Sequence, residues 1–171
     1  MVTDENMINR YDTGSIFLHW ALALLVLISI ACIELHDLYP KGSATYDTLK
    51  STHGQLGFLL FFLTLLRLIW RLLHPVPSIT PSPRPWEIRA RKVGHAAIYT
   101  VLLTLGILGI TMGNFFLTQR NKELVNFLKE THEILGNFLI VLIAIHLAAT
   151  LWHTWVRHDD TVRRMLPSRS S

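Results

Sequence analysis

The sequence predicts an all-α integral membrane protein whose four helices form one bundle. Half of the 171 residues are hydrophobic and 16% are charged, which is less charge than an ordinary soluble domain carries. Four apolar runs are close to the ~20 residues that a membrane-spanning helix needs. They cover residues 16–33, 57–73, 95–117 and 134–155. We therefore expect a single transmembrane domain over residues 1–171, with helices at about 14–35, 53–74, 92–117 and 131–157.

A proline-rich link divides the four predicted helices into two pairs. No small-residue cleavage site follows the first run, so we interpret it as a membrane helix and not as a cleaved signal peptide. Arg67 and Arg71 interrupt the second run. The proline-rich segment 75–85 then forms a stiff, non-helical link. Glycines in the third run suit either a close-lying cofactor or helix packing, and the sequence leaves both open: Gly106, Gly109 and Gly113.

Basic residues predict the orientation of the bundle. They gather in the loop after the second run and in the C-terminal tail. The positive-inside rule places both segments in the cytoplasm, and an even number of spans places the N-terminus there too. We expect a multi-pass membrane protein with both termini in the cytoplasm. The net charge of +4 is divided among loops, so it indicates contact with lipid headgroups and does not favour nucleic acid.

Two histidines on the fourth predicted helix indicate a pair of ligand positions. His132 and His146 are fourteen residues apart, which corresponds to ~21 Å of helix and to nearly the same helix face. One imidazole then lies near each side of the hydrocarbon core. This arrangement suits a protein that carries electrons between two metal centres across a bilayer.

Depth in the predicted helices assigns a partner to each of these two histidines. His53 opens the second helix on the outer side, level with His132. His19 lies several residues into the first helix on the inner side, which favours His19 with His146 as the deeper inner pair. His95 and His153 then lie near the inner headgroup boundary.

Haem iron is the metal that best fits these four histidines. An iron with two imidazole ligands has no open position and cycles electrons, and a four-helix bundle accommodates flat macrocycles between its helices. Cys32 is the single cysteine, so a thioether attachment is impossible and each haem is of the noncovalent b type. Zinc or copper is less attractive because cysteine and intramembrane carboxylates are scarce.

Arg67 is a candidate for binding a haem propionate. It follows His53 by fourteen residues and so lies on nearly the same helix face, ~21 Å further inward. A buried arginine requires an anion, and haem propionates supply one. Snorkelling to the inner headgroups is the alternative, and it suits Arg71 better.

Five segments of the chain resemble the bacterial branch of the cytochrome b561 family. They are FLHWALALLVL, STHGQLGFLLFFLTLLRLIWRL, KVGHAAIYTVLL, THEILGNFLIVLIAIHLAATLWH and the tail DDTVRRMLP. The resemblance implies a dihaem membrane cytochrome with His19 and His146 on one haem and His53 and His132 on the other. It also implies a superoxide:ubiquinone oxidoreductase, in which the outer haem takes electrons from superoxide and the inner haem passes them to ubiquinone.

The residues are compatible with that chemistry. Cations of the outer loops could attract superoxide, although an ordinary mixed-charge loop explains each of them: Lys41, Arg120, Lys122 and Lys129. His95 and His153 are candidates for binding ubiquinone and supplying protons, and bridging of helices is their structural alternative. Two other functions stay open, namely a cytochrome b subunit serving a dehydrogenase or hydrogenase partner, and a non-redox, histidine-lined metal transporter.

Overall fold

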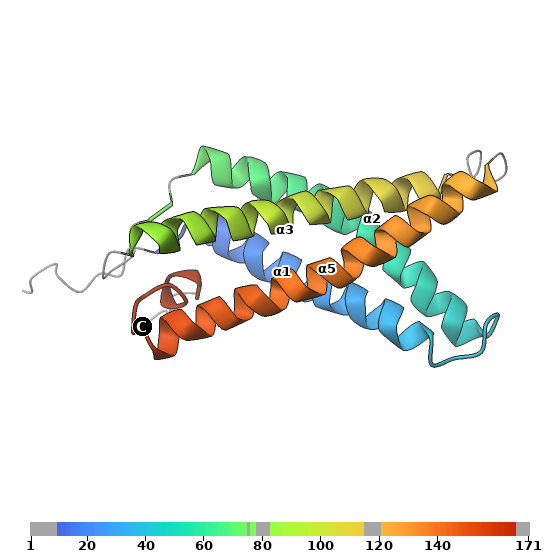
Figure 1. The fold of residues 1–171 in the computed structure, drawn as a ribbon, viewed down its shortest axis with the longest axis horizontal. Coiled ribbons are helices and arrows are strands. Elements are labelled where there is room, and N and C mark those ends of the chain that lie inside the picture. The colour runs from blue at the N-terminus through green and yellow to red at the C-terminus, as the bar shows by residue number, and fades with distance from the viewer. Residues whose placement is uncertain (1–9, 75, 78–82, 115–120, 167–171) are drawn as a thin grey trace, which may run out of the picture.

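The computed structural model describes residues 10–74, 76–77, 83–114 and 121–166 and contains four long helices (Figure 1). A short 3-10 turn, η2, follows them at Arg163–Met165. Each long helix is long and apolar enough to cross a membrane, and the described residues include no strand. The predicted all-α membrane architecture is confirmed. The helices are α1 (Thr13–His36), α2 (Ala44–Leu73), α3 (Pro85–Met112) and α5 (Lys122–Trp155).

Three helices begin seven to nine residues before their predicted starts, because polar turns precede their apolar runs. The Ser43 side chain accepts a hydrogen bond from the backbone N–H of Tyr46 and so caps α2. Asn121 caps α5 in the same way, through the N–H of Leu124. Such caps start a helix in water, well before the chain enters the bilayer. His53 therefore lies well inside α2, and not at its first turn as predicted.

The other helix boundaries differ less from the predicted ones or lie outside the described residues. α1 extends the predicted range by one residue at each end. α3 starts at Pro85, a favoured residue for a first helical position, and ends at Met112. The last three residues of the predicted third helix, 115–117, and most of the proline-rich link lie outside the described residues.

Consecutive helices are antiparallel, so the bundle has two distinct ends (Figure 1). We call the end with the start of α1 and the last turn of α5 the inner end, and the opposite end the outer end. α1 packs against α2, α2 against α3, and α3 against α5, whereas in the described part of the chain α5 packs closely along α3 alone. Gly106 of α3 lies directly against the Phe61 ring of α2. Helix packing is therefore the reason for this glycine.

An apolar layer crosses the middle of the bundle. Side chains from all four helices form it, and together they are the largest part of the buried core: Leu22, Val26, Leu60, Val101 and Leu139. Leu139 lies seven residues from both His132 and His146. The layer therefore separates an outer histidine level from an inner one.

The C-terminal tail folds back over the inner end and contacts the N-terminal segment. The Trp20 indole N–H donates to the carbonyl of Met165 over 2.7 Å, and the Arg10 guanidinium donates to that of Leu166 over 3.0 Å. Arg164 is almost fully buried, with its guanidinium 5.3 Å from the centre of the Tyr11 ring. The tail thus closes the inner end and fixes the start of α1.

Candidate functional site

The outer level holds one pair of imidazoles, as predicted from depth. His53 of α2 and His132 of α5 have ring centroids 6.1 Å apart and planes inclined by 83°. The rings come from two helices that do not pack closely along their backbones. The two side chains therefore face each other across a gap between α2 and α5.

Local contacts orient both outer rings. Nδ1 of His53 donates to the carbonyl of Ser29, at 2.9 Å, and lies 3.1 Å from the Ser29 hydroxyl. A proton on Nδ1 leaves Nε2 with the lone pair that a metal requires. Gly109 of α3 lies 3.7 Å from the His132 ring, so a larger side chain there would crowd this imidazole. Nδ1 of His132 is buried, and the backbone of Leu105 on α3 is its neighbour for a hydrogen bond.

Space is available beside the outer pair. A side chain added at Gly54, Gly57 or Gly136 would meet no other atom within 4 Å. Gly54 and Gly57 flank His53 on α2, and Gly136 lies one turn after His132 on α5. This open volume fits the approach of a large flat ligand to the backbone of both helices.

The inner level holds three imidazoles. His146 of α5 lies 6.3 Å from His19 of α1 and 5.6 Å from His95 of α3, measured between ring centroids. The predicted neighbours His19 and His146 are together. His95 lies deeper than predicted, because it faces His146 and makes no ring contact with His153 among the described residues.

The spacing of the rings fits haem iron at both levels. Two metal–imidazole bonds of about 2 Å each, plus about 1 Å from each nitrogen to its ring centre, separate the centroids by roughly 6 Å. The outer pair and the His19–His146 pair match this value, and the His95–His146 distance of 5.6 Å is close to it. When bound between each pair, haem b would supply one-electron redox chemistry and no open coordination position.

Arg67 is buried at the inner level and connects three helices. Its Nη1 donates to the carbonyl of Ser15 over 2.8 Å, and its Nε donates to the hydroxyl of Tyr99 over 3.1 Å. Its Nη2 lies 3.3 Å from Nδ1 of His19, the ring nitrogen that carries the proton when Nε2 binds a metal. All three nitrogens therefore have protein partners, and Arg67 fixes the position of His19 relative to α2 and α3.

His153 belongs to a separate group at the end of α5. Its Nδ1 donates to Asp159 over 2.5 Å, and the other Asp159 oxygen accepts the Thr161 N–H over 3.0 Å. Burial would raise the pKa of Asp159, but these hydrogen bonds outweigh burial and lower it. The ionised carboxylate thus fixes the orientation of the His153 ring and leaves Nε2 for another partner.

Other predicted residues lie away from these groups. Lys41, Lys122 and Lys129 are exposed near the outer end, and Arg120 lies outside the described residues. Among the residues that the structure describes, no three His, Cys, Asp or Glu side chains are placed to hold a single metal ion.

Three supporting residues were missed from the sequence. Ser29 is a polar residue within the first apolar run, which is a usable signal for a buried hydrogen bond. Tyr99 interrupts the third run in the same way. Asp159 lies in the tail beyond the helices, and only the chain reversal at its neighbour His158, which has a φ of 51°, brings it back to His153.

Comparison with known proteins identifies the family. The family model for prokaryotic cytochrome b561 matches residues 10–168. Cytochrome b561 homolog 1 of Escherichia coli (strain K12) is 34% identical, covering 94% of this chain and 99% of that protein. A Yersinia pestis protein named probable superoxide oxidase CybB is 31% identical, covering 95% and 99%. Cytochrome b561 homolog 2 of Escherichia coli is 28% identical, covering 97% and 96%. The chain belongs to the prokaryotic cytochrome b561 family of membrane electron-transfer proteins, which bind b-type haem.

Proposed function

We propose that the chain binds two b haems, one between His53 and His132 and one between His19 and His146, and transfers electrons between them across the membrane. One observation carries this proposal. α5 presents two imidazoles, and each faces an imidazole from another helix at the spacing of a bis-imidazole iron. The apolar layer around Leu139 lies between the two levels.

The proposed substrates are superoxide at the outer end and ubiquinone at the inner end. The name of the Yersinia pestis relative supports superoxide as the donor. Two superoxide ions release two electrons and leave two molecules of oxygen. Ubiquinone takes up these two electrons with two protons and becomes ubiquinol, so atoms and charges balance. The reaction therefore needs a proton donor at the inner end and none at the outer end.

His153 and His95 are the proposed ubiquinone residues. Asp159 holds Nδ1 of His153 and leaves Nε2 free to donate a hydrogen bond or a proton to a quinone oxygen. Nδ1 of His95 donates to the carbonyl of Arg91 over 2.8 Å, so its Nε2 faces away from its own helix turn. His95 lies against His146, which would place it between the inner haem and the quinone.

The proposed orientation places the inner end in the cytoplasm of a bacterium and the outer end beyond the inner membrane. The basic residues of the segments at the inner end support it. Under this orientation ubiquinone takes its protons from the cytoplasm.

Spectroscopy of the purified protein tests the proposal. We expect reduced b-type absorption bands to appear when a superoxide-generating system is added to the oxidised protein in air-saturated buffer. The bands should bleach when a soluble ubiquinone is added. The haem content should be about two per chain, as two bis-histidine sites require.

The same sample separates the alternatives. Absence of b-type bands would contradict the haem assignment altogether. If the haem stays oxidised with superoxide but is reduced by a co-purifying dehydrogenase or hydrogenase, the electron donor is that protein and not superoxide. Superoxide dismutase, added before the donor, is the control that must abolish the reduction.

A further inference from the structure

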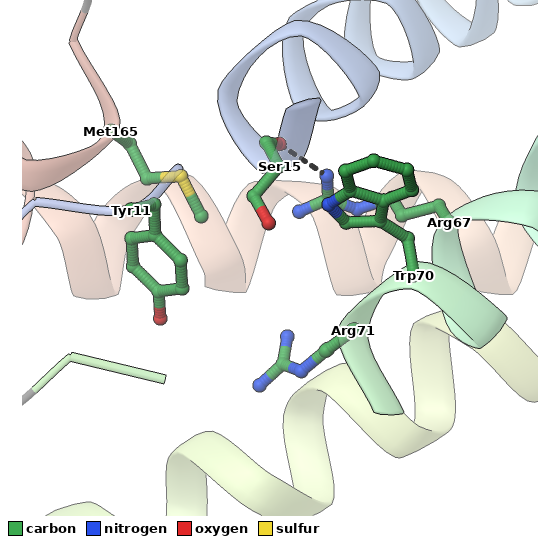
Figure 2. Close-up of a pocket in the computed structure, with 6 residues that line it drawn as sticks. All are labelled: Tyr11, Ser15, Arg67, Trp70, Arg71 and Met165. Carbon is green, nitrogen blue, oxygen red and sulfur yellow. Dashed lines mark hydrogen bonds between the residues drawn. The ribbon is translucent and has the colours of Figure 1, made fainter. Parts of the chain in front are cut away.

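The inner end contains a second arginine, Arg71, which has no part in the haem contacts proposed above. Arg71 follows Arg67 by four residues, so the two guanidinium groups lie on the same face of α2. Arg71 lines a pocket with Tyr11, Ser15, Trp70 and Met165, in addition to Arg67 (Figure 2). Figure 2 shows its guanidinium extended into this pocket from α2.

The two arginines differ in their hydrogen bonds. Arg67 is committed to Ser15, Tyr99 and His19. Arg71 is half-buried and has no hydrogen bond or ion pair to any residue that the structure describes. A partly buried guanidinium with five unused N–H donors favours an anion with planar, paired oxygens.

The protein lining of the pocket cannot supply that anion. Its other side chains are neutral or basic. Asp12 is a carboxylate next to this lining in sequence, but its two oxygens already accept from Ser15 and Trp70. Arg67, which lines the same pocket, lies 3.3 Å from Nδ1 of His19, so the pocket borders the inner imidazoles. The anion that Arg71 would bind therefore belongs to something lying next to the inner imidazoles.

We propose that Arg71 binds a carboxylate of the inner haem through the pocket lined by Tyr11 and Trp70, and that Arg67 acts as the positioning residue for His19. This inference rests on the proposed haem between His19 and His146. Protohaem carries two propionates, and a carboxylate offers a guanidinium the bidentate geometry it prefers. The sequence alone favoured Arg67 for this role and headgroup contact for Arg71. The contacts of Arg67 reverse that preference.

Haem reconstitution with a modified cofactor tests the inference. The His53→Ala variant should hold the inner haem alone, so its apoprotein in neutral-lipid nanodiscs reports a single binding constant by Soret titration. In this background, Arg71→Leu should weaken protohaem binding about tenfold, as loss of a charge-assisted hydrogen bond does. Arg71→Lys should lose less. Arg89→Leu removes an exposed cation of α3 at the same end and should change nothing.

Haem dimethyl ester, which lacks the carboxylates, completes the test. With this cofactor Arg71→Leu should bind as tightly as the parent, because the charge partner of Arg71 is gone. Arg67→Leu should weaken both cofactors equally, because it acts through His19. If Arg71→Leu had the same small effect on the binding of protohaem and of the dimethyl ester, the inference would be overturned. Equal binding of the two cofactors by the parent variant would also overturn it.

Two further outcomes are distinguishable. If Arg71 instead binds a lipid phosphate, binding will depend on phosphatidylglycerol in the nanodisc and not on esterification, and the inference fails. If His53→Ala binds no haem, or still binds two, the proposed haem assignment fails before Arg71 is examined.

Discussion

The outer and inner histidine levels differ in charge and in number of imidazoles. At the outer level two rings face each other, and the supporting contacts are neutral, from Ser29 and Gly109. At the inner level three rings lie together beside two arginines. Positive charge in a medium of low dielectric stabilises the reduced form of a nearby redox centre. We therefore expect the inner haem to have the higher potential, which favours electron transfer inward.

The largest expected effect comes from removing an outer ligand. His53→Ala or His132→Ala leaves iron with one imidazole, so we expect loss of the outer haem and about half of the total haem. The inner haem should keep its spectrum, because the apolar layer separates the two levels. Haem content per protein and the reduced-minus-oxidised spectrum measure both effects. Loss of both haems from either variant would contradict the proposed assignment of two separate haem sites.

The next effect concerns the charge at the inner level. Arg67→Leu removes a buried cation and the contact with His19, so the inner haem should be bound less tightly and its potential should fall. We expect a shift on the order of 60 mV, which is a tenfold change in a one-electron equilibrium. A potentiometric titration resolves the two haems. If the potential of the inner haem were unchanged in Arg67→Leu, positive charge would not explain the expected difference between the two levels.

The third imidazole of the inner level gives a smaller effect. His95→Ala should keep both haems, because His19 and His146 have the spacing of the iron ligands. It should slow re-oxidation by ubiquinone, if His95 supplies a hydrogen bond or proton there. Stopped-flow absorbance measures this rate, with His36→Ala, at the outer end of α1, as a matched control. Loss of the inner haem from His95→Ala would instead identify His95 as a ligand.

The smallest effect concerns the start of α1, which carries His19. Asp12 caps this helix through the N–H of Ser15. Burial would raise the pKa of Asp12, but hydrogen bonds with Ser15 and Trp70 outweigh it and lower the pKa from 3.8 to about 2. Its ionised form therefore stabilises the fold fully above pH 3.8, and this contribution disappears as the pH falls towards 2.

Asp12→Ala should cost about 1 kcal/mol, the usual value for loss of a cap, and should lower the Tm by about 2–4 °C. Circular dichroism in detergent at pH 7 measures the change. Asp12→Asn keeps an accepting oxygen and should lose less. The difference between the wild type and Asp12→Asn should disappear as the pH falls from 3.8 to about 2. A Tm for Asp12→Ala equal to that of the wild type would show that the cap contributes nothing.

The sequence predicted the four membrane helices and the two levels of His132 and His146 because hydrophobicity and helical spacing are local properties. It predicted the neighbours His53 and His132 correctly from depth alone. It placed His95 with His153 because depth does not tell which face of a helix looks inward. It also missed the contact of Asp159 with His153, since that contact depends on a reversal of the tail. The first turns of three helices are polar and lie outside the bilayer, so the apolar runs did not predict them.

The separation of α5 from α1 and α2 has a consequence for how the protein is made. α1, α2 and α3 pack on one another in chain order, whereas α5 follows α3 closely and reaches α1 and α2 through side chains such as Leu139 and the histidines. A newly inserted chain can therefore assemble its first three helices without any cofactor. Haem bound as proposed would add contacts from α5 to α1 and α2, so in a haem-starved cell α5 would be held mainly by α3 and would be more open to membrane proteases.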